Sequence, residues 1–161
     1  MSYGQESVEK RISRIAAGVT VCEVVCKWKE GAVNPDLVQY YRNLSSSHPE
    51  HGKSHDKHPA AVKHFTRCVS LFQRVDGVDV LQFVLYVHEY PRNCSHPNKG
   101  RVYISYLDSV KFFEPCKLRT SVFQEILHVY FFFIQKSGFY DTVHLWSCPT
   151  KHSDDYIIII I

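Results

Sequence analysis

The sequence predicts an α+β fold, in which a mixed central β-sheet is flanked by helices. Two apolar runs, at 66–73 and 78–88, have the length and composition of neighbouring strands. The pair Asp76-Gly77 between them is typical of a tight hairpin turn. A third, alternating run follows at 101–110, and a long apolar helical pattern comes after it. Several strands combined with a long helix indicate this mixed architecture.

Size and composition fit one globular unit over residues 1–161. The chain has 161 residues, of which 45% are hydrophobic and 22% charged, so it can form a core. Its net charge of +3 does not indicate a strong basic patch, so we expect no direct contact with nucleic acid. The first ten residues are polar, and no apolar run reaches membrane-spanning length. We therefore expect no signal peptide and no membrane segment.

The N-terminal part is predicted to hold a helix at about 6–16 and a strand at about 19–27. In such a strand, Cys22 and Cys26 would point the same way. No second cysteine pair completes a zinc site around them. The six cysteines are scattered, which favours reduced thiols in an intracellular protein.

A polar stretch at 28–59 is predicted to be a long connection, with a short helix starting at Pro35. Its part at about 45–60 is rich in histidine. Four histidines recur there beside two acids: His48, His51, His55, His58, Glu50 and Asp56. Imidazoles in this number can bind zinc or copper, whereas the surrounding Ser, Pro, Gly and Lys indicate a solvated flexible loop. We expect the loop and no bound metal.

The run after residue 100 alternates as a strand does and should end near Asp108-Ser109. One face would carry Val102, Ile104 and Tyr106. The other face would carry Tyr103, Ser105 and Leu107.

A helix is predicted to begin close to Arg119-Thr120 and to end at Lys136 and Gly138. Ser121 and Gln124 have the spacing of a capping box. The apolar helix surface consists of Val122, Phe123, Ile126, Leu127, Val129, Tyr130, Phe133 and Ile134. Unpaired amides and the dipole at a helix start favour negative charge, and an arginine fork beside them can bind phosphate. The alternative is a surface arginine near an ordinary cap.

The segment 141–149 alternates again and would place His144, Trp146 and Cys148 on one face. Together, these segments resemble the catalytic domain of the CREB-binding-protein type of lysine acetyltransferase. The resemblance is clear over 66–157 and weak over 1–60. The matching text is 101–110, Phe112-Phe113, Pro115, Leu118-Arg119-Thr120, Glu125-Ile126-Leu127, Trp146, Cys148-Pro149 and Asp154-Asp155-Tyr156-Ile157.

The resemblance implies an acetyltransferase-like central sheet and a histone or protein lysine acetyltransferase of the transcription-coactivator type. It implies acetyl-CoA as co-substrate, histones and transcription factors as partners, and location in the nucleus. The positions that would contact acetyl-CoA are Leu107, Asp108, Ser109, Arg119 and Thr120. The positions that would line a tunnel for the acceptor lysine are Tyr106, Trp146, Cys148 and Tyr156.

An aromatic tunnel suits the chemistry, because a lysine ammonium has no lone pair with which to attack a thioester. The solution pKa of lysine is about 10.4, and burial among rings favours the neutral amine. Aromatic walls also orient the aliphatic stem of the lysine. In this interpretation, Cys148 has no covalent role. The alternative is that Tyr106, Trp146 and Cys148 are core residues.

Some positions depart from the family pattern. Phe123 stands where the family usually has tyrosine, Gln124 where it has histidine, and Val129 where it has glycine. The family domain continues beyond the position of Tyr156 and there supplies its general acid. The terminal run 157–161 is all isoleucine, which is strand-prone, so we expect a domain incomplete at its C-terminus. The alternative function is a catalytically silent remnant that acts as a cofactor-binding or protein-interaction module.

Overall fold

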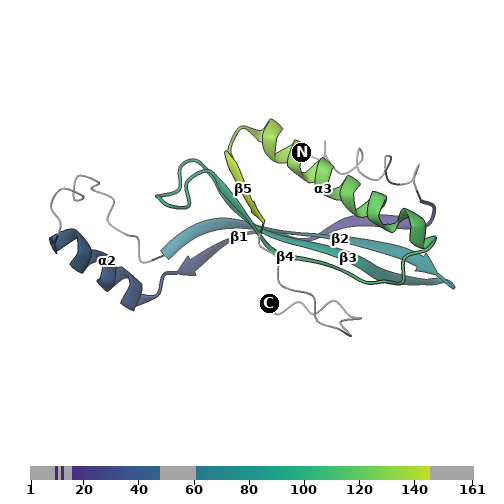
Figure 1. Ribbon diagram of the computed structural model, residues 1–161, viewed down its shortest axis with the longest axis horizontal. Coiled ribbons are helices and arrows are strands. Elements are labelled where there is room, and N and C mark those ends of the chain that lie inside the picture. The colour runs from purple at the N-terminus through teal and green to yellow at the C-terminus, as the bar shows by residue number, and fades with distance from the viewer. Residues whose placement is uncertain (1–9, 11, 13–15, 48–60, 146–161) are drawn as a thin grey trace.

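The computed structural model describes residues 10, 12, 16–47 and 61–145. These residues form one five-stranded sheet in the order β1-β2-β3-β4-β5 (Figure 1). The strands are β1 (Val19–Ala32), β2 (Ala61–Val75), β3 (Val78–Tyr90), β4 (Arg101–Ser109) and β5 (Thr142–Leu145). The first four strands are antiparallel neighbours, and β5 runs parallel to β4. The predicted mixed sheet of an α+β fold is confirmed.

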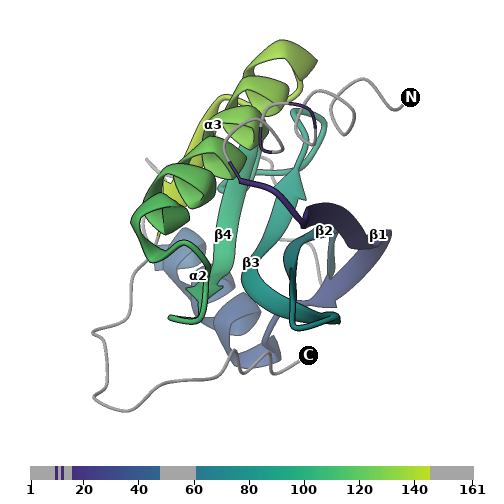
Figure 2. The same ribbon diagram turned by 90° about the vertical axis from the view of Figure 1, so that its right-hand side faces the viewer.

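The main helix, α3 (Arg119–Ser137), lies across one face of the sheet, called here the helix face (Figure 2). It follows a short 3₁₀ turn, η1 (Cys116–Leu118). It ends at Gly138, whose φ of 68° is the left-handed conformation that glycine adopts readily. The helix α2 (Pro35–Ser47) projects beyond the end of β1 and the start of β2 (Figure 1). Within the described residues, no helix is long and apolar enough to cross a membrane.

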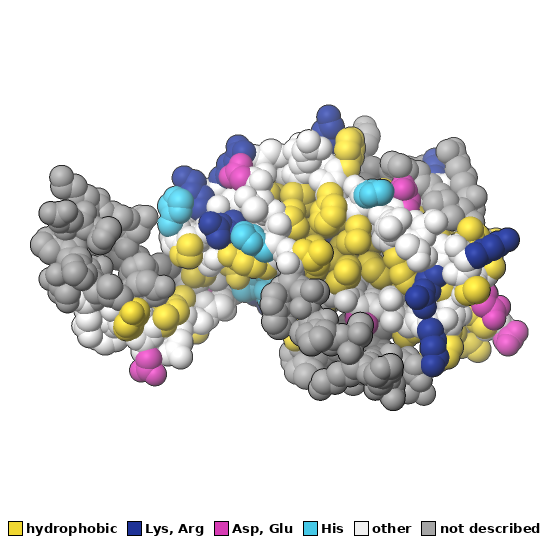
Figure 3. Space-filling model, in the orientation of Figure 1, with side chains coloured by type: hydrophobic (Ala, Val, Ile, Leu, Met, Phe, Trp, Pro, Cys, Tyr) yellow, Lys and Arg dark blue, Asp and Glu magenta, His cyan; other side chains and the backbone are white. Residues whose placement is uncertain are grey.

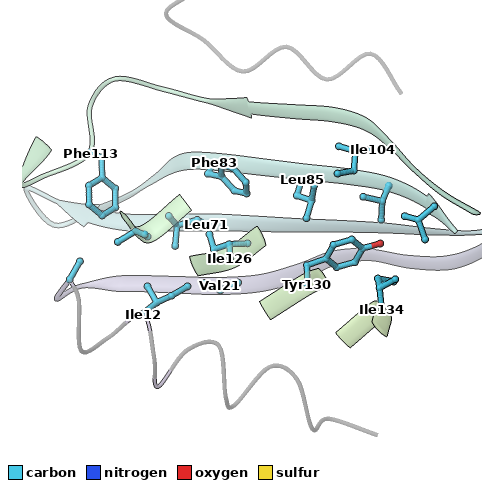
Figure 4. Packing of buried hydrophobic residues seen from close by; sticks show 14 residues of the cluster. Ile12, Val21, Leu71, Phe83, Leu85, Ile104, Phe113, Ile126, Tyr130 and Ile134 are labelled. Atoms are coloured by element: carbon cyan, nitrogen blue, oxygen red, sulfur yellow. The ribbon is translucent and has the colours of Figure 1, made fainter. Parts of the chain in front are cut away.

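The main core lies between the helix face and α3 (Figure 4). Its sheet side is built from Val21, Leu71, Phe83, Leu85, Val87, Val102 and Ile104. Its helix side comes from Val122, Ile126, Tyr130 and Ile134, all within the predicted apolar surface. The sequence also predicts Phe133 as part of that surface, but its side chain is 39% exposed, so this part of the prediction is wrong. A smaller cluster of Cys68, Val84 and Tyr86 lies on the opposite face, called here the far face.

β-Bulges correct two predicted strand faces. In β4, Tyr106 pairs with Tyr86 whereas Ile104 pairs with Val87, so Ser105 is an extra residue. Tyr106 therefore lies on the far face and does not share a face with Ile104, as the alternation had predicted. A bulge in β1 between Glu23 and Val25 has the same effect.

The bulge in β1 separates the two cysteines that were expected to point together. Cys22 pairs with Ser70 on the far face, whereas Cys26 pairs with Arg67 on the helix face. The described residues contain no group of three or more His, Cys, Asp or Glu side chains that could hold a metal ion. The described cysteines are free thiols.

Other element boundaries also differ from the predicted ones. The hairpin turn at Asp76-Gly77 and the helix start at Pro35 are confirmed. The polar stretch is not one long connection, because β1 continues to Ala32, α2 extends to Ser47, and β2 begins at Ala61. The histidines at 48, 51, 55 and 58 lie outside the described residues, as does most of the predicted helix at 6–16.

A buried carboxylate connects three parts of the core. Glu89, at the end of β3, is 1% exposed on the helix face. Its Oε1 accepts hydrogen bonds from Arg67 Nε at 2.8 Å and from the Tyr130 hydroxyl at 3.1 Å, and its Oε2 accepts one from the Tyr140 hydroxyl at 3.0 Å. Arg67 also pairs with Glu23 on β1. This group of five side chains, the Glu89 network, fastens α3 and the segment after it to the sheet.

Burial and the charge of Glu89 together set the protonation states in the Glu89 network. Burial works to lower the pKa of Arg67, but the hydrogen bond and negative charge of Glu89 raise it above its ordinary value. Burial, reinforced by Glu89, raises the pKa of the Tyr130 and Tyr140 hydroxyls, so both remain donors. The network therefore holds a paired charge with hydrogen-bond partners for both carboxylate oxygens.

Candidate functional site

The candidate site begins where β4 ends. Leu107 pairs with Leu85 and Ser109 with Phe83, which places both on the helix face. Asp108 pairs with Val84 on the far face, and its Oδ1 accepts a hydrogen bond from the Ser109 amide at 2.8 Å. Leu107 is 39% exposed although its cross-strand partner is completely buried. The strand end therefore exposes both apolar and polar side chains to solvent.

The connection between β4 and α3, residues 110–118, is held at three points, two on the sheet and one on α3. The Val110 amide donates to the Gln82 carbonyl oxygen at 3.0 Å. Phe113 is 1% exposed, and its ring centroid lies 5.8 Å from that of Phe123 on α3. The Glu114 amide donates to Gln73 Oε1 at 2.9 Å, and Gln73 Nε2 donates back to the Glu114 carbonyl oxygen. These contacts give the connection one defined path from strand to helix.

The connection delivers Arg119 and Thr120 to the first turn of α3, as predicted. The capping box at Ser121 is not formed, because the N-cap is Leu118 and makes no side-chain cap hydrogen bond. The Arg119 amide bonds instead to the Cys116 carbonyl oxygen. The 3₁₀ turn thus takes the place of a capping side chain. The end of β4 and the start of α3 lie at the same end of the sheet (Figure 1).

The start of α3 carries positive charge where a helix dipole favours negative charge. Arg119 is half-buried and Lys117 exposed, and α3 has no acidic residue in its first turn. Within the described part of the chain, the Arg119 guanidinium has no ion pair or side-chain hydrogen bond. A guanidinium next to helix amides is well placed to bind a phosphate or carboxylate. The arrangement can therefore bind an anionic ligand.

Tyr106 lies on the other side of the sheet in a group of polar aromatic side chains. Its ring is 6.1 Å from that of Tyr86, whose hydroxyl accepts a hydrogen bond from Lys29 Nζ at 3.3 Å. Tyr86 in turn packs against His88 at 5.5 Å between ring centroids. Tyr106 is 40% exposed, so it is not a fully buried core residue.

His88 is held as a neutral ring in this group. Burial, with the positive charges of His64 and Lys29 as further causes, lowers the pKa of His88 to about 4. Its Nδ1 lies 3.3 Å from Ser105 Oγ, and its ring centroid lies 4.7 Å from that of His64. The bulge residue Ser105 thus provides a polar contact for an imidazole that stays uncharged.

Because of His88, the stability of the fold is expected to decrease as the pH is lowered. Its pKa is lower in the folded than in the unfolded chain, so its contribution is constant above about pH 6.5 and is lost as pH falls from about 6.5 to about 4. Melting temperatures measured across this range should fall less steeply in His88→Gln, which remains neutral. The exposed His128 is the control, and His128→Gln should leave the slope unchanged. An unchanged slope in His88→Gln would contradict this assignment.

The structure describes part of the predicted site. It places Leu107, Asp108 and Ser109 at the strand end and Arg119 and Thr120 at the helix start it leads to. Trp146, Cys148 and Tyr156 lie outside the described residues. A cavity of about 670 Å³ opens elsewhere, lined partly by Trp28, Lys63 and Cys94 at the opposite end of β2 from Gln73.

Sequence reasoning missed Gln73 and Glu89. Both stand at inward positions of their strands, in line with Leu71 on β2 and Val87 on β3. A polar residue at an apolar position of an alternating pattern was the available signal, because a buried polar group needs a partner.

A twisted mixed sheet, one long helix and a basic helix start at the end of a strand define an α+β domain suited to an anionic ligand. The family description "Histone acetyltransferase domain KAT3" matches residues 9–160. The chain belongs to this family of CREB-binding-protein-type histone acetyltransferase domains. Membership agrees with the predicted resemblance and implies acetyl-CoA as the family's acetyl donor.

Three curated relatives match part of the chain. Protein cbp-1 of Caenorhabditis elegans is 46% identical over 99 residues, which cover 62% of this chain and 5% of the relative. "Probable histone acetyltransferase HAC-like 2" of Oryza sativa subsp. japonica is 41% identical over 110 residues, covering 64% of this chain and 8% of the relative. "Histone acetyltransferase HAC12" of Arabidopsis thaliana is 41% identical over 110 residues, covering 64% and 6%. The chain thus spans less than a tenth of these relatives.

Proposed function

We propose that this chain carries the acetyl-CoA site of a lysine acetyltransferase that acts on histones and transcription factors in the nucleus. Family membership supports this proposal, since the relatives include named histone acetyltransferases. The observation that carries it is Arg119, a half-buried guanidinium without an ion pair in the described residues, at the start of α3. An anionic coenzyme would give this guanidinium an ionic partner.

Two groups of residues would hold the coenzyme. Arg119 would bind a phosphate of acetyl-CoA through its fork, and Thr120 would add a hydroxyl and a helix amide beside it. Leu107, Asp108 and Ser109 would contact the coenzyme along the strand end. Acetyl-CoA supplies the acetyl group as a thioester, which is reactive toward a neutral amine.

The acceptor lysine would enter between aromatic side chains. In this proposal, Tyr106, Trp146, Cys148 and Tyr156 line the passage, exclude water and orient the lysine stem. Exclusion of water lowers the pKa of the ammonium and so favours the neutral nucleophile. The exposed fraction of Tyr106, 40%, supports a role at the mouth of such a passage.

Two measurements on the whole chain test this function. Acetyl-CoA at about 100 times its Kd should stabilise the fold by about 2.7 kcal/mol, seen as a higher Tm. Acetylation of a histone-tail peptide should follow, and Trp146→Ala should abolish it. Binding without turnover would indicate the silent cofactor-binding module instead. Neither stabilisation nor turnover would contradict the proposed function.

A further inference from the structure

We propose that Gln73 is a positioning residue for the coenzyme site: its side-chain amide clamps the β4–α3 connection at Glu114 and thereby holds Arg119 in its binding position. This inference rests on the proposed function, in which Arg119 binds coenzyme phosphate. Gln73 lies on β2, two strands away from β4, and does not belong to the family motif matched above.

The clamp is a two-point contact between a side chain and the main chain. Gln73 is 3% exposed, and its amide is satisfied at both ends by one residue, Glu114. A carboxamide that both donates to a carbonyl and accepts from an amide fixes the orientation of that peptide segment. Main-chain contact of this kind depends on the position of Glu114 and not on its side chain.

The path from Glu114 to Arg119 is short and internally bonded. The Leu118 amide donates to the Pro115 carbonyl oxygen at 2.9 Å, and the Arg119 amide bonds to the Cys116 carbonyl oxygen. The five residues after the clamp therefore form one tight turn that leads directly into α3. A shift of Glu114 would be passed along this turn to Arg119, and binding to phosphate through a fork is sensitive to such displacement.

The neighbouring strand provides a matched control. Gln82 on β3 is also a buried glutamine, 0% exposed, and it contacts the same connection at Val110. That contact uses the Gln82 main-chain carbonyl, whereas its side-chain Oε1 and Nε2 have no hydrogen-bond partner among the residues that the structure describes. Replacing the Gln82 side chain therefore leaves the contacts of the connection in place, whereas replacing the Gln73 side chain removes the contact at Glu114.

The test compares acetyl-CoA affinity in Gln73→Met and Gln82→Met, each corrected for the folded fraction. We expect an affinity about tenfold lower in Gln73→Met, equivalent to about 1.4 kcal/mol, and a change of less than about twofold in Gln82→Met. If the chain turns over, Gln73→Met should raise KM for acetyl-CoA and leave kcat nearly unchanged.

A double-mutant cycle with Arg119→Ala separates positioning from general stability. Because Gln73 acts through Arg119, Gln73→Met should reduce affinity by less than about twofold in an Arg119→Ala background. An equal loss in both backgrounds, or no loss in either, would overturn the inference. If Gln73→Met does not fold, Gln73→Asn, which keeps an uncharged carboxamide but is one methylene too short to reach Glu114, decides by the same cycle.

One result separates this inference from the proposed function. If the unaltered chain does not bind acetyl-CoA, the proposed function fails and the clamp inference fails with it. If the unaltered chain binds and Gln73→Met binds equally well, the clamp alone is wrong.

Discussion

Glu89→Ala is expected to lower the free energy of unfolding by about 3–5 kcal/mol, the usual cost of removing one partner of a buried ion pair. Glu89 is 1% exposed and accepts three hydrogen bonds, from Arg67, Tyr130 and Tyr140. Its removal leaves a largely buried guanidinium with Glu23 as its one remaining acidic partner among the described residues, and two hydroxyls without their acceptor. Single domains have a free energy of unfolding of about 5–15 kcal/mol, so the loss is a large share.

Removal of the Glu89 carboxylate should also affect the candidate site, because α3 carries Arg119. Tyr130 is near the middle of the helix, and its hydroxyl is one of the polar contacts by which α3 is fastened to the sheet. Loss of the carboxylate should therefore loosen the helix whose first residue is Arg119. Urea unfolding followed by circular dichroism measures the change as a lower midpoint at constant m-value.

Two further variants show whether burial causes the effect. Glu89→Gln removes the charge but keeps a hydrogen-bond acceptor, so its loss should be smaller than that of alanine. Asp79→Ala breaks the exposed ion pair to Arg74, which is 3.7 Å long with side chains 64% and 63% exposed, and should cost less than about 1 kcal/mol. Equal losses for Asp79→Ala and Glu89→Ala would contradict the assignment of Glu89 as the main polar anchor.

The elements were predictable because their signals are local. The pair Asp76-Gly77 turns the hairpin, Asp76 having a φ of 49° and Gly77 of 82°. Gly138 ends α3, and Pro35 opens α2. Each position depends on backbone preference within a few residues, which a single sequence displays.

Strand faces were less predictable because a bulge is a property of two paired strands. The alternation in β4 continues without a break in the sequence, yet the extra residue Ser105 moves Tyr106 to the opposite face. The same applies to Cys22 and Cys26, whose common face is lost at the bulge in β1. Register relative to a distant strand decides both cases, and no local pattern encodes it.

In the candidate site, too, local features could be predicted from the sequence and long-range contacts could not. Arg119 at a helix start could be predicted from the helix boundary alone, whereas its lack of an ion pair in the described residues required the fold. The clamp by Gln73 joins residues 41 positions apart and could not be predicted from spacing. Tyr103 and His144, whose ring centroids lie 4.9 Å apart, belong to the paired strands β4 and β5. The alternation at 141–149 predicted a strand there but not its partner.

Arg119→Ala is expected to weaken acetyl-CoA binding by about 10- to 100-fold if Arg119 binds phosphate as proposed. Hydrogen bonds to charged groups contribute about 1.5–3 kcal/mol, and each 1.4 kcal/mol is a factor of ten in affinity. The guanidinium is half-buried and has no ion pair in the described residues, so its removal should change the stability of the free protein little. Calorimetric titration with acetyl-CoA gives the affinity, and the Tm without ligand checks the fold.

Arg119→Lys distinguishes charge from geometry. Lysine keeps the positive charge but cannot bind phosphate with two parallel N–H groups, so its affinity should lie between those of the unaltered chain and Arg119→Ala. Arg101→Ala is the matched control, because Arg101 is the first residue of β4 and lies at the opposite end of that strand from the candidate site. Its affinity should be unchanged. The dependence of binding on salt should also weaken in Arg119→Ala, since an ionic contact is screened by added ions. Full affinity in Arg119→Ala would remove the start of α3 from the coenzyme site.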